Sequence, residues 1–183
     1  ISRRGRFPPP WAARLGEPSW FEGELNAIEH AEDVDQAAKQ ACRLVHAFAD
    51  RVVFMAMRKS SLQGWTGLGP GVEPLRLRQL ALSLESPCAF RKAMMSRKPY
   101  QGELGDSHAE QLFRTELHPA PYEINLHPVV VEGRAAGLLC IEGICSEKCP
   151  TQGAERASEA LGKAIRHARE RRARARLPSR KQD

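Results

Sequence analysis

The stretch LHPVVVEGRAAGLL, residues 126–139, decides the fold predicted for this chain. Two apolar runs, 124–131 and 135–141, flank Glu132-Gly133-Arg134, and a glycine-containing turn between two such runs indicates a β-hairpin. Because proline cannot donate a hydrogen bond to a neighbouring strand, Pro128 predicts that the first strand lies at an edge or carries a bulge.

Further strand patterns precede this hairpin. Residues 51–57 form a near-continuous apolar run with β-branched and aromatic members, which is typical of a central strand. Residues 62–67 are predicted to return beside it. Residues 80–84 alternate leucine with smaller side chains, as a half-buried strand does, and 100–104 predict a short strand.

Helices are predicted before, between and after these strands. The first runs over about 33–49 and is capped by Asp33. Ser86-Pro87 predicts the start of a second, with serine at the cap and proline at the first helical position. Ser107 and Glu110 have the spacing of a capping box, and a final helix starts near Thr151. The chain is therefore predicted to be an α+β protein.

Residues 33–170 resemble a GAF domain. The resemblance rests on the 51–57 strand followed by QGWTG at 63–67, on the Ser86-Pro87 helix, and on the 126–139 hairpin. It implies an antiparallel sheet of five to six strands, with the N- and C-terminal helices on one face. Short helices and a ligand pocket are implied on the other face. Members of this family usually bind and signal rather than catalyse, so the resemblance implies a non-catalytic regulatory module.

The resemblance leaves the ligand open. GAF domains bind cyclic nucleotides, haem, bilins or small metabolites, and many bind nothing. The acidic-aromatic signature of the cyclic-nucleotide binders is not found, nor is the Cys-His environment of the bilin binders. We therefore expect no cofactor, and a regulatory module that acts through a protein partner, with a small-molecule sensor as one alternative.

Five aromatic and methionine side chains are the candidates for the pocket wall. If the family layout holds, the middle helices and the facing strands bring these residues together, and such side chains line many small-molecule sites. Alternatively, they form a second core, which is the more frequent role of a helical apolar stripe. The candidates are Trp65, Phe90, Met94, Tyr100 and Phe113.

Cysteines supply the other candidate chemistry. Cys88 is predicted in the first turn of the Ser86-Pro87 helix, where free N–H groups favour a thiolate, so it is a redox candidate or a half-buried structural residue. Cys140, Cys145 and Cys149 could share a metal with His127, or the last two could form a disulfide. Their spacing matches no standard zinc ribbon, so no metal is expected. No other constellation indicates catalysis, and we expect no enzyme.

Charge divides the 183 residues into three parts. Residues 1–24 are a Pro- and Arg-rich lead, 25–168 the GAF-like domain, and 169–183 an Arg-rich tail. Residues 1–14 carry a net charge of +4 and 163–183 a net charge of +7, so residues 15–162 are acidic, at −5. The tail predicts contact with a polyanion such as nucleic acid, or a solvated end. Its candidate residues are Arg169, Arg171, Arg172, Arg174 and Arg176.

Small residues predict how the terminal helices pack. Either they let the terminal helices of two chains approach closely and form a homodimer, or they let these helices cover the sheet within one chain. The residues are Ala37, Ala38, Ala41, Ala154, Ala157 and Ala164. No segment is long and apolar enough for a membrane span. Five cysteines without a secretory signal favour a reducing cytoplasm, and 21 arginines against 7 lysines suggest a bacterial source. Because the chain begins at Ile1 without methionine, we interpret it as a processed form or part of a longer chain.

Overall fold

A six-stranded antiparallel sheet organises the computed structural model, which describes residues 18–118 and 123–176. Residues 1–17 of the expected lead and 177–183 of the expected tail lie outside the described residues. The strand order is β3-β2-β1-β6-β5-β4. The strands are β1 (Ala49–Arg58), β2 (Ser61–Leu68), β3 (Ala81–Ser83), β4 (Tyr100–Gly102), β5 (Ile124–Val131) and β6 (Arg134–Ile144).

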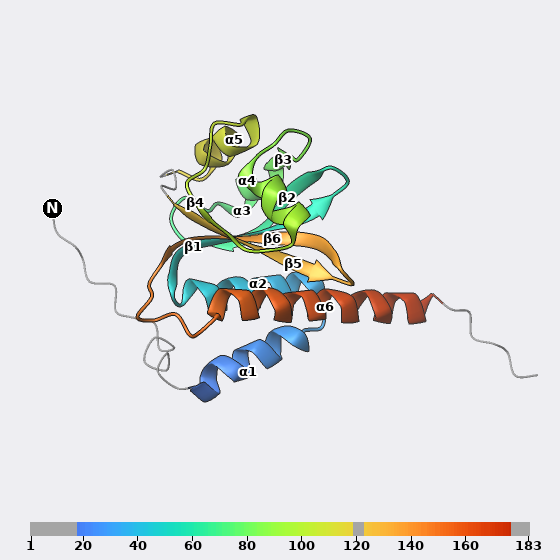
Figure 1. Cartoon of the computed structure of the whole chain (residues 1–183). Coiled ribbons are helices and arrows are strands. Elements are labelled where there is room, and N and C mark those ends of the chain that lie inside the picture. The colour runs from blue at the N-terminus through green and yellow to red at the C-terminus, as the bar shows by residue number, and fades with distance from the viewer. Residues whose placement is uncertain (1–17, 119–122, 177–183) are drawn as a thin grey trace, which may run out of the picture.

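Helices cover both faces of this sheet (Figure 1). On one face lie α2 (Val34–His46) and α6 (Gly153–Ala175), with α1 (Pro18–Glu29) packed on their outer side. On the other face lie α3 (Pro74–Gln79), α4 (Ala89–Ser96) and α5 (His108–Glu116). The predicted α+β class is confirmed, and so is the arrangement of terminal helices on one face and short helices on the other.

The hairpin that decided the prediction forms β5 and β6, and it turns at Glu132-Gly133. Strand β5 lies between β6 and β4, but β4 pairs only with residues 124–126. Within the described residues, Pro128 therefore lies where no strand pairs with the outer side of β5, and the β5–β6 register shifts one residue later, between Val129 and Val130. Both consequences predicted for this proline, an edge and a bulge, are observed.

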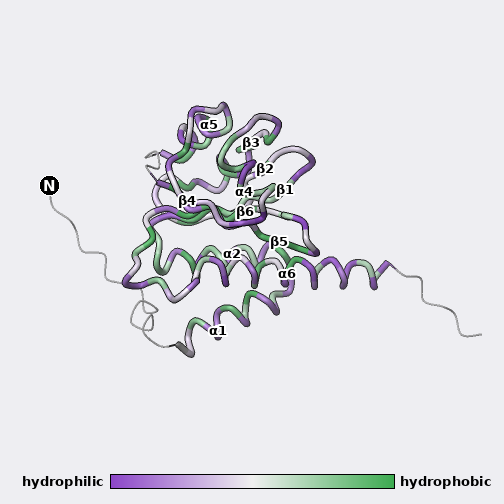
Figure 2. Tube along the Cα trace, in the orientation of Figure 1, coloured by the Kyte–Doolittle hydropathy of each residue, from purple (hydrophilic) through white to green (hydrophobic). Residues whose placement is uncertain are grey.

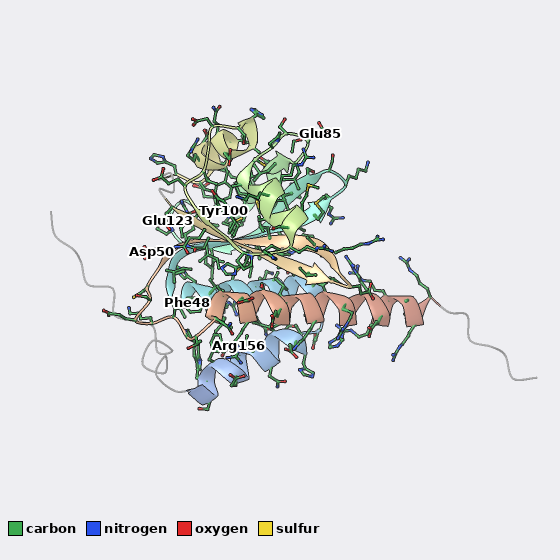
Figure 3. The ribbon with its side chains drawn as sticks, in the orientation of Figure 1. Phe48, Asp50, Glu85, Tyr100, Glu123 and Arg156 are labelled. Atoms are coloured by element: carbon green, nitrogen blue, oxygen red, sulfur yellow. The ribbon has the colours of Figure 1, made fainter. Side chains whose placement is uncertain are left out.

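Alternation along the strands builds two separate cores. Val52 and Phe54 of β1 face α2 and α6, whereas Val53 and Met55 face the short helices. Figure 3 shows the division directly, because Phe48 lies on the α2 and α6 side of the sheet and Tyr100 on the α4 and α5 side. Apolar segments concentrate at both interfaces with the sheet (Figure 2).

Two helix starts show how local chemistry sets the boundaries. The capping box is confirmed: the Ser107 hydroxyl accepts from the Glu110 N–H, and the Glu110 carboxylate accepts from the Ser107 N–H. The predicted start of the second helix at Ser86-Pro87 is wrong by two residues. Cys88 has extended backbone angles and is the N-cap of α4, so its sulfur accepts from the Arg91 N–H.

Helix α1 spans the expected boundary between residues 24 and 25 and adds a third layer outside α2 and α6. Its Phe21, Leu25 and Ile28 are buried. The six alanines considered for dimerisation are also buried within this one chain. Those alanines therefore pack within one chain, which is the second of the two roles predicted for them.

None of the helices formed by the described residues combines the length and the apolar character that a bilayer crossing needs.

Candidate ligand clefts on the two faces of the sheet

Four of the five predicted pocket residues belong to one cluster on the short-helix face. Phe90 and Phe113 are fully buried, with ring centroids 5.1 Å apart. Met94 is buried beside them, and Tyr100 is half-buried with its hydroxyl donating to the Glu103 carbonyl at 3.0 Å. Burial of the two phenylalanines favours the alternative role, as core, while Met94 and Tyr100 lie toward the surface.

Trp65 does not join this cluster, and the expectation that it shares a site with the other four is wrong. It packs against the core beneath α2 and α6, on the opposite face of the sheet. Leu62 of the same strand is buried on the short-helix face, and residues an odd number of positions apart in a strand point to opposite faces. Trp65 is also the residue left unpaired where the β1–β2 register shifts, since Phe54 pairs with Thr66 and Met55 with Gly64.

The short-helix face carries a cleft of about 440 Å³, which we call the methionine cleft. Met57, Met94 and Met95 line it, and Met95 is 68% exposed. Arginines close its ends by binding backbone carbonyls: Arg91 donates to Glu85, and Arg97 donates to Gly133 at 2.8 Å. An apolar wall of flexible methionines adapts to ligands of varied shape.

The terminal-helix face carries a second cleft of about 350 Å³, which we call the Trp65 cleft. Its walls come from the start of α2, the end of β1, and the exposed part of α6; its apolar floor includes Phe54, Ala56, Ala136 and Ile165. The Trp65 Nε1–H donates to Asp35 Oδ1 at 3.2 Å, and the Arg58 guanidinium lies 5.7 Å from the centre of the indole ring. Arg169 and Arg172 of α6 complete the rim.

The five predicted tail arginines therefore have different surroundings, although all are exposed. Arg169 and Arg172 line the Trp65 cleft, so the structure places them with Trp65. Arg171 donates to the carbonyls of Ala31 and Glu32, at 3.1 and 2.9 Å. Arg174 and Arg176 lie in the last turn of α6 and at its C-cap.

The cysteines are not assembled as a metal site. All five are free thiols, and no group of three or more metal-ligating side chains is found among the residues that the structure describes. Cys140 and Leu126 both face the short-helix core. His127 is adjacent to Leu126 in β5, so it points to the opposite face of the sheet, toward α6. Burial raises the pKa of the Cys42 thiol to about 12 and raises that of Cys140 well above its usual range.

His127 has a buried Nδ1 atom without a hydrogen-bond partner among the described residues. Burial lowers the pKa of this imidazole from 6.5 to about 4, so the folded state holds it neutral at pH values where the unfolded chain binds a proton. The free energy of unfolding therefore falls as pH falls through this interval.

The His127→Gln variant tests this pH dependence. Between about pH 7 and about pH 5, we expect the variant to lose about 2 kcal/mol less unfolding free energy than the parent chain. Urea unfolding at the two pH values measures the difference, and the exposed His108→Gln is the control. Equal pH dependence in all three proteins would contradict the assignment.

A buried ion pair on the short-helix face was missed by the sequence reasoning. Arg51 is 3% exposed; its Nε donates to Glu142 Oε1 at 3.0 Å and its Nη2 to Oε2. Its Nη1 also donates to the carbonyls of Pro70 and Leu117, at 2.9 and 3.0 Å. Burial raises the pKa of the Glu142 carboxyl, and the guanidinium opposes that rise. The sequence did carry a signal for this pair: Arg51 is a charged residue near the start of the apolar strand β1, and Glu142 is one near the end of the apolar strand β6.

Comparison with solved structures gives matches over most of the chain. A methyl-accepting chemotaxis protein segment, residues 122 to 287, is 16% identical with a TM-score of 0.66, covering 83% of this chain and 99% of that one. The GAF domain of a phosphoenolpyruvate-protein phosphotransferase from Coxiella burnetii is 17% identical with a TM-score of 0.66, covering 88% and 96%.

An enzyme also appears among the matches. Free methionine-R-sulfoxide reductase from Neisseria meningitidis is 15% identical with a TM-score of 0.62, covering 91% of this chain and 97% of that one. Comparison with family models gives no match, and neither does comparison with curated proteins. The similarity thus lies in three-dimensional structure, at identities that establish the fold and leave the activity open. The chain has the fold of a GAF domain.

Proposed function

We propose that this chain is a non-catalytic regulatory module that contacts a protein partner through its terminal helices. The observation that carries the proposal is the end of α6, where residues 169–176 are all exposed. Figure 1 shows that the last part of α6 extends past the sheet and past α1 and α2, and Figure 2 shows that this part is largely hydrophilic. A projecting, basic helix end offers a partner with an acidic surface a charged contact.

The rest of α6 supports transmission through the same helix. It packs on α1, α2 and β5, so displacement of its exposed end acts on a continuous helix that crosses the domain. Gly162 allows close approach to β5, because a Cβ there would lie 2.5 Å from the Val130 carbonyl oxygen. The Cys42 and Cys140 thiols are poor candidates for nucleophilic catalysis, because burial raises their pKa values.

We also propose that the module works in a reducing cytoplasm. The support is that all five cysteines, each within the described residues, carry free thiols. A second copy of the chain is one candidate partner, and light scattering of the purified protein distinguishes it from a different protein.

Partner capture from extracts of the source organism tests the main proposal. We expect a protein retained by the parent chain to be lost with Arg174→Glu/Arg176→Glu and kept with Arg76→Glu/Arg78→Glu, which changes charge equally on the exposed side of α3. The retained complex should weaken as salt rises, since an exposed charged contact is screened. Equal retention by all three chains, or retention by none, would contradict the proposal.

The nucleic-acid alternative uses the same arginines and predicts a different result. A fluorescent oligonucleotide would then bind the parent chain with steep salt dependence, and deletion of residues 169–183 would abolish the binding. The end of α6 carries no aromatic side chain for base stacking, so we favour the protein partner.

A small-molecule sensor is the second candidate function. The observation that favours it is the presence of two clefts, of about 440 and 350 Å³, which are within the usual size range of ligand sites. The Trp65 cleft is the better placed for signalling, because two of its lining residues, Arg169 and Arg172, belong to the exposed end of α6.

A further inference from the structure

The Trp65 cleft combines an apolar floor with a cationic rim. Phe54, Ala136 and Ile165 contribute to the floor, and the rim carries the guanidinium groups of Arg58, Arg169 and Arg172. Arg169 and Arg172 are three positions apart on α6, which places both on the same side of that helix. The cleft thus presents two kinds of surface to whatever enters it.

The cleft's two carboxylates are already engaged by its own walls. Asp33 caps α2 by accepting from the Gln36 N–H at 2.8 Å. Asp35 binds the Lys39 ammonium at 2.6 Å through Oδ2 and the Trp65 indole N–H at 3.2 Å through Oδ1. The hydrogen bond from Lys39 is the largest cause that holds the pKa of Asp35 below its usual value, so this carboxylate is ionised at neutral pH.

The three rim arginines are not neutralised in this way. Among residues 18–118 and 123–176, no carboxylate forms an ion pair with Arg58, Arg169 or Arg172. The Arg58 guanidinium lies over the indole ring, a contact that leaves its positive charge in place. The cleft's three guanidinium groups therefore outnumber its two carboxylates, so an added anion would meet unpaired positive charge.

We propose that the Trp65 cleft binds a small organic anion with a flat apolar body and one carboxylate or phosphate group. The apolar body lies against the floor and Trp65, and the oxygens of the carboxylate or phosphate accept hydrogen bonds from Arg169 and Arg172. A volume of about 350 Å³ suits a small molecule. A folded partner would instead need a surface of roughly 800 Å², which a cleft of this size does not supply.

This inference rests on the second candidate function and supplies its ligand class. The site lies on the face opposite to the pocket implied by the sequence. An anion between Arg169, Arg172 and the sheet would tie the first projecting residues of α6 to the domain, and so couple occupancy to the proposed partner surface.

Nuclear magnetic resonance of the ¹⁵N-labelled full chain tests the site. The three tryptophans give three indole N–H signals, and Trp65→Phe identifies the signal of Trp65. The probes are benzoate and phenyl phosphate, with benzamide as the neutral analogue of benzoate and inorganic phosphate as the anion without an apolar body. We expect at least one of the two organic anions to shift the Trp65 signal saturably, with a Kd at or below about 1 mM.

Matched variants locate the binding. Arg169→Gln/Arg172→Gln should weaken the bound anion by about tenfold or more, because both charged donors are lost. Arg174→Gln/Arg176→Gln removes equal charge from the same helix outside the cleft and should leave Kd unchanged. Both pairs are exposed, so thermal unfolding should be the same in the two variants.

Four results would overturn the proposal: no saturation by either organic anion, equal binding of benzamide, equal binding of inorganic phosphate, or equal weakening by both variants. Failure of the partner proposal is distinguishable, because its variant is Arg174→Glu/Arg176→Glu. If the anion binds but no captured partner is lost on replacing Arg174 and Arg176, the anion site stands and the partner proposal fails. If such a partner is found but neither organic anion binds, the partner proposal stands and the anion site fails.

Discussion

Replacement of Glu142 by alanine is expected to lower the free energy of unfolding by about 3–5 kcal/mol, because it leaves the Arg51 guanidinium buried without its counter-charge. Arg51 cannot turn to solvent without losing its hydrogen bonds to the Pro70 and Leu117 carbonyls. These bonds connect the start of β1 with the loop after β2 and with the end of α5. Urea unfolding at neutral pH measures the loss.

An exposed ion pair supplies the control for Glu142→Ala. Glu116 binds Arg76 at 3.3 Å, and 30% of its side chain is exposed. Glu116→Ala should cost no more than about 1 kcal/mol, because solvent screens exposed pairs. Equal losses in the two variants would show that burial of Arg51 and Glu142 does not set the energy.

The double replacement Arg51→Met/Glu142→Leu separates charge from packing. It removes both buried charges and retains apolar volume, so it should recover part of the stability lost in Glu142→Ala. Recovery is expected to be incomplete, because the Pro70 and Leu117 carbonyls lose a shared donor. No recovery at all would locate the energy in the carbonyl contacts instead of the ion pair.

Prediction from sequence succeeded where a pattern extends over several residues. Strands β1, β5 and β6 have long apolar runs. The capping box of α5 was recognisable because Ser107 and Glu110 stand at the fixed three-residue spacing that reciprocal capping hydrogen bonds require. Helix α3 was missed because its six residues are too few to show a period. Helix α1 was missed because the Pro- and Arg-rich lead was taken to extend to residue 24, across the first half of this helix.

The placement of Trp65 shows how a site prediction fails within a correctly predicted strand. Trp65 was grouped with Phe90 by chemical type, although its odd spacing from Leu62 already indicated opposite faces. The two clefts could not be predicted at all, since each is formed by side chains from distant segments. Arg172, for example, meets Trp65 only because α6 returns across the sheet.

Phe113→Ala is the second large effect expected, a loss of about 3–5 kcal/mol in the free energy of unfolding. The Phe113 ring is fully buried against Phe90, with its centroid 5.1 Å away, and truncation leaves a cavity among close-packed neighbours. Phe113→Leu keeps most of the volume and should cost markedly less. Met95→Ala, at the exposed rim of the methionine cleft, should change stability by less than about 0.5 kcal/mol.

The Phe113→Ala result also decides between core and pocket on the short-helix face. A core residue contributes to stability whether or not a ligand is present, whereas a pocket wall is maintained by the rest of the fold and tolerates truncation. A large loss in Phe113→Ala with little loss in Met95→Ala would therefore place the core at Phe90 and Phe113 and confine any ligand to the methionine cleft at its edge. A stable Phe113→Ala variant would instead restore the pocket predicted from the sequence, because only a cavity that is already open loses so little when a ring is removed.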